Sequence, residues 1–263
     1  MKKIISLSLS VILILCFICS CAPKNSEPIP NPISEFEYEL SDKGATIVKY
    51  IGNAKEVVIQ NSIDGHAVMY IYDYAFMSKP IEKVVIPDSV EQIGEKAFAN
   101  CQSLKEVTFG NGLKKILVQA FDNCTSLEEI QFPESLEEIY PQAFINCINL
   151  KKLHINKNLN SIGHENFFHS PIEELTIQDG LKAFGSYTTF WNATIKEITI
   201  PASVENVREC SFSDNLEKVY FLGNAPQKVG VDPFGSKATI YYKKGTSGWD
   251  TTPLKDTYTL IEY

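Results

Sequence analysis

The chain has 263 residues, a length that suits one or two domains, and its 44% of hydrophobic and 21% of charged residues are typical of a folded protein. Its 24 lysines and arginines stand against 32 aspartates and glutamates, and the resulting formal charge of −8 argues against binding to a nucleic-acid backbone. No apolar run reaches about 18 residues, which argues against a conventional transmembrane helix.

The amino terminus has the features of a secretory signal. Lys2 and Lys3 supply positive charge, and the apolar run over 4–18 is interrupted only by serines. The run ends in Ile-Cys-Ser-Cys-Ala-Pro over 18–23, which resembles a bacterial lipobox. This resemblance implies cleavage of residues 1–20 and attachment of a diacylglyceryl group to Cys21. The alternative is an ordinary signal peptide in which Cys21 is incidental.

Residues 21–35 hold four prolines and show no periodic pattern, which predicts an extended, semi-rigid tether. More than one acyl chain on the amino terminus would be enough for stable anchoring. The sequence therefore predicts an extracytoplasmic protein of the cell envelope, lipid-anchored at the cell surface. Loss of the two signal lysines would change the formal charge of the mature chain to −10.

An internal repeat dominates the rest of the chain. Apolar residues recur at intervals of 22 or 23 at Ile71, Ile93, Ile116, Ile139, Ile162, Phe184 and Val207. A phenylalanine stands five positions after all but one of them, at Phe76, Phe98, Phe121, Phe144, Phe167 and Phe212. Each unit then has an alternating segment, such as 106–109, that is typical of a half-buried strand. The sixth unit has Thr189 in place of phenylalanine, and we expect Trp191 to fill the missing volume.

A period of 22–23 residues lies within the leucine-rich-repeat range. It predicts a leucine-rich-repeat solenoid, mainly β, with one short parallel strand per coil and irregular or short helical segments on the opposite wall. A single coil cannot bury its own apolar face, so the stack of coils is the stable unit. We expect the phenylalanines to form a column through its core.

The unit Ile-Gly-Glu-Lys-Ala-Phe-Ala-Asn-Cys-Gln-Ser-Leu-Lys-Glu-Val-Thr-Phe over 93–109 resembles the repeat of the BspA-like class of leucine-rich repeats. That class occurs on bacterial surface antigens and adhesins. The resemblance covers 71–223, about seven units. It implies that 36–70 form an amino-terminal cap or variant first coil and that 224–263 form a carboxy-terminal cap.

Three cysteines, Cys101, Cys124 and Cys147, recur at intervals of 23 residues, each after an asparagine. Equivalent positions in neighbouring coils lie about 4.8 Å apart, a distance that allows a disulfide. However, three cysteines in one orientation cannot all pair, and zinc sites use tighter clusters such as Cys-x-x-Cys. We therefore favour buried thiols over a disulfide or a metal column. Cys210 has no equivalent and stays unassigned.

The sequence carries none of the common catalytic or nucleotide-binding motifs. His154, His164 and His169 fall in neighbouring coils, but their places in the repeat predict that they point in different directions as solvated surface residues. We expect no enzyme activity, no cofactor and no catalytic or metal site.

The outward positions of the predicted strands form the one extended surface that could select a partner. The candidate partner-binding residues are Glu106, Thr108, Glu129, Gln131, Lys152, His154, Glu174, Thr176, Glu197, Thr199, Lys218 and Tyr220. The row is mixed in charge, and Tyr220 is its only aromatic member. A second candidate is the group Tyr70, Tyr72 and Tyr74, which could equally pack under the first cap.

These features predict an adhesin or surface antigen that binds an unidentified protein or other surface macromolecule through the solenoid. It would contact no nucleic acid and would reach the membrane only through its lipid anchor. One alternative is a structural spacer lipoprotein of the envelope without a specific ligand. Another is a glycan-binding accessory protein, which would need exposed aromatic platforms, and Trp191 and Trp249 are the tryptophans available for this role.

Overall fold

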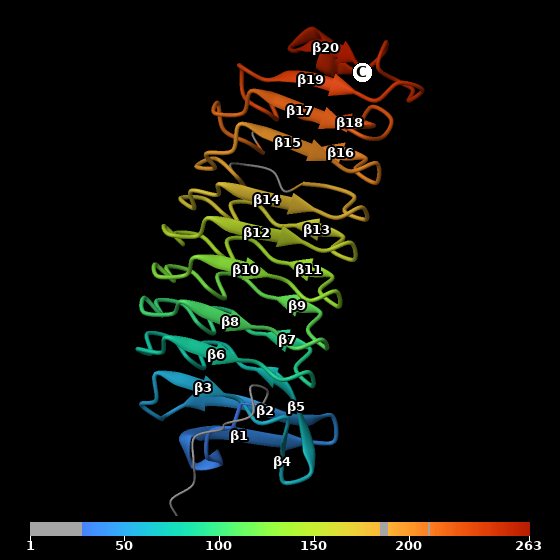
Figure 1. Ribbon diagram of the computed structural model, residues 1–263. Coiled ribbons are helices and arrows are strands. Elements are labelled where there is room, and N and C mark those ends of the chain that lie inside the picture. The colour runs from blue at the N-terminus through green and yellow to red at the C-terminus, as the bar shows by residue number, and fades with distance from the viewer. Residues whose placement is uncertain (1–27, 185–188, 210) are drawn as a thin grey trace, which may run out of the picture.

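The computed structural model describes residues 28–184, 189–209 and 211–263. The predicted signal segment, the first part of the tether, Cys21 and Cys210 lie outside the described residues. The described chain winds into a stack of similar coils, with the amino-terminal segments at one end and β20 at the other (Figure 1). In the part of the chain that the structure describes, no helix is long and apolar enough to cross a membrane.

One wall of the stack consists of parallel strands, one from each coil. These strands are β3 (Glu56–Val58), β6 (Lys83–Val85), β8 (Glu106–Thr108), β10 (Glu129–Gln131), β12 (Lys152–Ile155), β14 (Glu174–Ile177), β15 (Glu197–Ile200), β17 (Lys218–Phe221), β19 (Thr239–Tyr242) and β20 (Thr259–Glu262). They form three separate sheets in the orders β3-β6-β8, β10-β12-β14 and β15-β17-β19-β20. The solvent side of this wall is called the strand face below.

A second ladder runs along the stack. Its longest sheet begins with β1 (Phe36–Ser41) and continues through β2 (Gly44–Tyr50), β5 (His66–Ile71), β7 (Gln92–Ile93), β9 (Lys115–Ile116), β11 (Glu138–Ile139) and β13 (Ser161–Ile162). Further along, β16 (Asn206–Val207) pairs with β18 (Lys228–Val229), and near the amino end β4 (Ser62–Ile63) pairs with β5. The prediction of one strand per coil missed this ladder because strands of two residues show no alternation.

The remaining wall consists of turns, and the described residues contain no α-helix. Two 3₁₀ segments, η1 (Ile33–Glu35) and η2 (Pro253–Asp256), lie near the ends of the stack. Asn100, Asn123 and Asn146 adopt positive φ angles of 59°, 59° and 62° in the turns. Asparagine tolerates this left-handed conformation better than most residues, which explains its recurrence before each cysteine.

A column of buried phenylalanines fills the core, as the repeat predicts. It consists of Phe76, Phe98, Phe121, Phe144, Phe167, Phe190, Phe212 and Phe234. Neighbouring rings are stacked with centroids 4.7–5.7 Å apart. Because every ring is covered by the next coil, the column links all the coils from Phe76 to Phe234 into one core.

The prediction for the sixth unit was wrong. Phe190 occupies the position in the column that was expected for Trp191. The centroid of its ring lies 5.4 Å from that of Phe167 and 5.0 Å from that of Phe212. Trp191 is 44% exposed and does not fill the core. The physical reason is that Phe190 follows Phe184 by six residues instead of five, which restores the 23-residue spacing from Phe167.

Candidate partner-binding face

The parallel pairing places the predicted partner-binding residues in two rows along the strand face. The first row is Glu106, Glu129, Lys152, Glu174, Glu197 and Lys218. The second row is Thr108, Gln131, His154, Thr176, Thr199 and Tyr220. Most of these residues are exposed, while His154, Lys218 and Tyr220 are half-buried. The rows are continuous within each of the three sheets but are interrupted between β8 and β10 and between β14 and β15.

Ion pairs between adjacent coils neutralise most of the charge in the first row. The pairs are Lys83–Glu106 at 2.6 Å, Lys152–Glu174 at 3.2 Å, and Lys218–Glu197. All of these side chains are exposed to solvent, so the pairs contribute little to the stability of the fold. Among the described residues, Glu129 is the member of the first row that forms no ion pair.

A third row flanks the first, at the residue that precedes each strand. Its charges alternate from coil to coil: Lys55, Glu82, Lys105, Glu128, Lys151, Glu173, Lys196 and Glu217. Ion pairs of 2.6–3.1 Å join Lys55 and Lys105 to Glu82, Lys151 to Glu173, and Lys196 to Glu217. Lys55 and Lys105 hold the pKa of Glu82 below its ordinary value by hydrogen bonding and by charge. Glu128 has no ion pair within the described ranges.

A groove opens on the strand face where the sheets β3-β6-β8 and β10-β12-β14 meet. Its volume is about 530 Å³, and a second hollow of about 280 Å³ shares Val107, Thr108 and Gln131 with it. The larger hollow is lined by Lys105, Glu106, Val107, Thr108, Glu128, Glu129, Gln131, Lys151 and Lys152. This β8–β10 groove is therefore lined by five of the predicted partner-binding residues, four from β8 and β10 and Lys152 from β12.

An aromatic group that was not predicted from the sequence lies at the carboxy-terminal end of the strand face. Tyr241 pairs laterally with Tyr220, and their rings stack with centroids 4.9 Å apart. Tyr263 is half exposed and meets Tyr220 edge-on at 5.8 Å. We call these three residues the tyrosine cluster. The alternating pattern of 218–221 recurs at 239–242 and could have revealed Tyr241, but the expected boundary at 224 removed it from the strand row.

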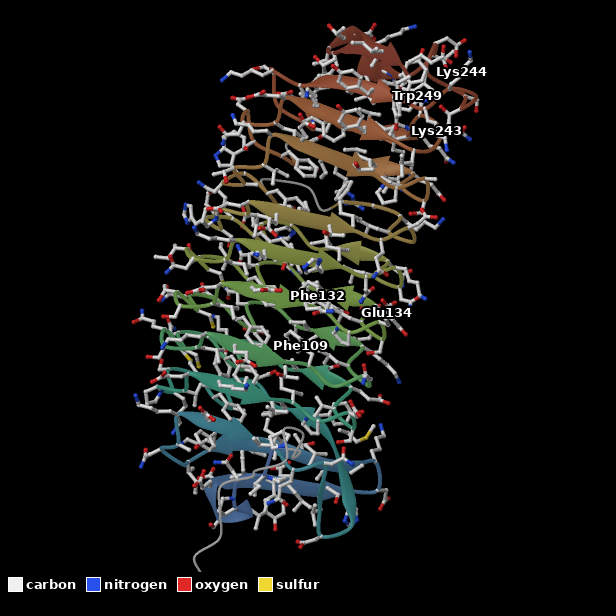
Figure 2. All side chains as sticks on the ribbon, viewed as in Figure 1. Phe109, Phe132, Glu134, Lys243, Lys244 and Trp249 are labelled. Carbon is white, nitrogen blue, oxygen red and sulfur yellow. The ribbon has the colours of Figure 1, made fainter. Side chains whose placement is uncertain are left out.

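The other aromatic candidates are separated from this cluster. Tyr72 and Tyr74 are about half exposed near the amino-terminal end, and the Tyr74 hydroxyl donates a hydrogen bond to Glu95 at 3.4 Å. Trp249 is only 5% exposed and stacks on Tyr242 at the carboxy-terminal end, beside Lys243 and Lys244 (Figure 2). With Trp249 buried, Trp191 is the one tryptophan that offers an exposed ring.

The three repeated cysteines are free and buried. The Sγ atoms of Cys101, Cys124 and Cys147 each donate a hydrogen bond of 3.1–3.4 Å to a phenylalanine carbonyl. Burial raises the pKa of Cys101 and of Cys147 to about 12, and raises that of Cys124 well above its ordinary value. No group of three or more histidine, cysteine or acidic side chains within the described residues could hold a metal ion.

These thiols predict a loss of stability in alkaline solution. In the unfolded chain they ionise near their ordinary pKa of 9.0, whereas the folded state keeps Cys101 and Cys147 neutral to about pH 12 and also raises the pKa of Cys124. The free energy of unfolding is therefore unaffected well below pH 9, and by pH 10 it falls by roughly 1.4 kcal/mol for each of Cys101 and Cys147. Urea unfolding at pH 8 and pH 10 measures this loss. A triple alanine variant of the three cysteines with the same alkaline loss would contradict the prediction.

The wall of parallel strands, the second ladder of short strands and the phenylalanine column define a leucine-rich-repeat solenoid. The family model for the BspA type leucine rich repeat region matches residues 69–192 and 184–240, with six copies of the repeat. The chain belongs to this BspA type leucine-rich-repeat family. The resemblance to the BspA-like class of leucine-rich repeats and the predicted fold class are thereby confirmed.

Solved structures of bacterial leucine-rich-repeat proteins are similar to this fold. A leucine rich repeat protein of T. pallidum has 28% sequence identity and a TM-score of 0.59, over 77% of this chain and 86% of its own. A leucine rich cell surface protein of Faecalibacterium prausnitzii has 22% identity and a TM-score of 0.55, over 82% of this chain and 76% of its own. No curated protein sequence matches the chain.

Proposed function

We propose that the chain is a non-catalytic protein-interaction module of the bacterial cell surface, an adhesin or surface antigen that binds a macromolecular partner through its strand face. The observation that carries this proposal is the tyrosine cluster, in which Tyr241 and Tyr263 join Tyr220, the single aromatic residue of the row from 106 to 220, to form an aromatic anchor on the polar strand face. Tyrosine is enriched among the residues that dominate binding energy in protein interfaces. Membership in the BspA type family supports a surface role, and it favours binding over catalysis.

The shape of the surface supports a protein partner in preference to a small molecule. The strand face extends over successive coils, and its charges are largely neutralised by ion pairs within the chain. Such a broad, weakly charged surface with a few aromatic anchors fits a protein interface. A glycan platform would need several flat exposed rings, whereas the stacked faces of Tyr220 and Tyr241 cover each other and Trp191 is a single exposed tryptophan ring.

The test is a quantitative binding experiment with residues 28–263. The chain is immobilised, partners are captured from host and bacterial extracts, and the affinity of each purified partner is then measured. We expect Tyr220→Ala with Tyr241→Ala to weaken binding by about tenfold or more. Tyr72→Ala with Tyr74→Ala is the matched control, because it removes two exposed tyrosines at the other end of the stack. Equal effects of the two double variants would contradict the proposed site, and capture of no partner would favour the structural spacer.

We further propose that Cys21 carries the lipid that holds the protein at the envelope. The lipobox-like segment over 18–23 and the four prolines of the tether over 21–35 support this proposal. Cys21→Ser is expected to move the protein from the membrane fraction to the soluble fraction of fractionated cells. An unchanged distribution would contradict lipidation while leaving the binding proposal intact.

A further inference from the structure

An apolar patch surrounds the tyrosine cluster at the carboxy-terminal end of the strand face. Strand pairing places in one row of outward residues Tyr220, Tyr241 and Ile261. Two residues further along the same strands, the next outward residues are Leu222, Lys243 and Tyr263. The hydrogen-bonded ladder reaches this second row, because the Lys243 amide still donates to the carbonyl of Phe221 at 3.1 Å. The carboxy-terminal patch is defined as Tyr220, Leu222, Tyr241, Ile261 and Tyr263.

The patch is apolar and accessible, unlike the polar coils that precede it. Leu222, Ile261 and Tyr263 are 40–50% exposed. In the preceding coils, the row of Tyr220 instead holds polar residues, at Thr108, Gln131, His154, Thr176 and Thr199. Large apolar side chains that gather on a surface, rather than lying singly, mark interaction sites. The strand face therefore offers a partner an apolar contact at this end.

Two lysines border the patch at the end of β19. Lys243 lies in the second row and Lys244 follows it, and both are exposed (Figure 2). Eleven ion pairs in the described chain hold eleven other lysines, each on a carboxylate of a neighbouring coil, but none involves Lys243 or Lys244. Glu262 is the acidic residue of β20, and it belongs to the inward-facing set because it lies beside Tyr242. The border of the patch therefore carries positive charge that no ion pair of the described residues neutralises.

This charge selects the kind of partner. Lys218 and Glu197, beside the patch, pair with each other, so Lys243 and Lys244 determine the local potential. A carboxylate that approaches the patch would be attracted, and a cation would be repelled. A second copy of the chain fits poorly, because a two-fold contact of the patch with itself would bring the lysines of both copies together.

We propose that the carboxy-terminal patch binds a segment of a partner protein in which a large apolar side chain and a carboxylate share one face. This inference rests on the proposed function, because it names the chemistry of the partner that the tyrosine cluster anchors. The apolar side chain would pack against Tyr241 and Ile261, and the carboxylate would lie on Lys243. Lys243 lies two residues beyond Tyr241, which is about 7 Å along a strand. An extended partner segment spans the same distance over two residues, so an apolar and an acidic residue separated by one position fit the patch.

The test uses the full-length chain and labelled eight-residue peptides with blocked ends. The first peptide repeats Leu-Ser-Glu-Ser, which places its leucines and glutamates on one face of an extended chain. The second has lysine in place of glutamate, and the third has alanine in place of leucine. Fluorescence anisotropy at physiological salt measures their affinities, and hydrogen exchange locates the bound peptide. We expect the first peptide to protect 218–222 and 239–243, and the other two to bind at least about tenfold more weakly.

Substitution of the two bordering lysines tests the role of charge. Lys243→Gln with Lys244→Gln should weaken binding of the first peptide by about tenfold and reduce its dependence on salt concentration. Lys228→Gln with Lys237→Gln is the matched control, because it removes the same charge from β18 and from the turn before β19, outside the carboxy-terminal patch. All four lysines are exposed, so neither double variant disturbs the core.

The inference is overturned if the first peptide fails to bind, if the lysine peptide binds equally well, or if both glutamine variants weaken binding equally. It is also overturned if a second copy of the chain covers the patch, seen by light scattering as a dimer that Tyr220→Ala with Tyr241→Ala dissociates. These failures are distinct from failure of the proposed function, which the captured partners test. A captured partner that depends on the tyrosine cluster but not on Lys243 and Lys244 would keep the proposed function and contradict the acidic segment.

Discussion

Replacing Phe121 with alanine is expected to lower the free energy of unfolding by about 3–5 kcal/mol. Phe121 is completely buried, and its ring lies parallel to those of Phe98 and Phe144, with centroids 5.0 Å away on either side. Its loss would leave a cavity in the middle of the column, where the neighbouring coils cannot collapse without breaking their own hydrogen bonds. The Phe121 amide, for example, donates to the carbonyl of Ala143 at 2.7 Å.

Chemical unfolding of residues 28–263, followed by circular dichroism, measures this change. Ile148→Ala is the control, because Ile148 is 52% exposed and its truncation should alter stability by less than about 0.5 kcal/mol. A loss below about 1 kcal/mol for Phe121→Ala would mean that the column contributes little to stability.

Deletion of 224–263 is expected to promote association of the chain. The segment contains β19 and β20. It also supplies Phe234 and Trp249, whose rings cover that of Phe221 with centroids 5.8 and 5.1 Å from its centroid. Without them, the last apolar coil and the edge of β17 would face solvent, and both favour contact with another chain.

Size-exclusion chromatography with light scattering, at several concentrations, measures the association. The undeleted chain at the same concentrations is the reference. A truncated chain that stays monomeric and loses no stability would show that 224–263 do not act as a cap.

Much of the core could be predicted because the repeat fixes it. A phenylalanine at a constant place in each 22–23-residue unit has to lie beside its equivalents in the neighbouring coils, so Phe98, Phe121 and Phe144 were correctly expected to stack. The error at Trp191 arose from counting positions within one unit from Phe184. Counting from Phe167 in the coil before gives Phe190, because the spacing between coils determines which rings can touch.

The details of the strand face could be predicted only in part. Alternation placed the outward residues of β8 to β17 correctly, since a strand exposes every second side chain. The β8–β10 groove depends on whether two backbones come close enough to pair. The alternation of inward and outward residues does not report this distance, since the strands break both at Phe109 and Phe132 and at Ile177 and Ile200. The tyrosine cluster depends on Tyr263 reaching Tyr220 across two coils, a contact that has no constant spacing in the repeat.

The proposal that the strand face binds a protein partner can be tested most directly by hydrogen exchange of the chain with and without a captured partner. We predict that the partner slows exchange in the strands of the strand face, most strongly in β17 and β19, and leaves the turns at 96–100, 119–123 and 142–146 unchanged. Protection confined to those turns, with the strand face unaffected, would contradict the account.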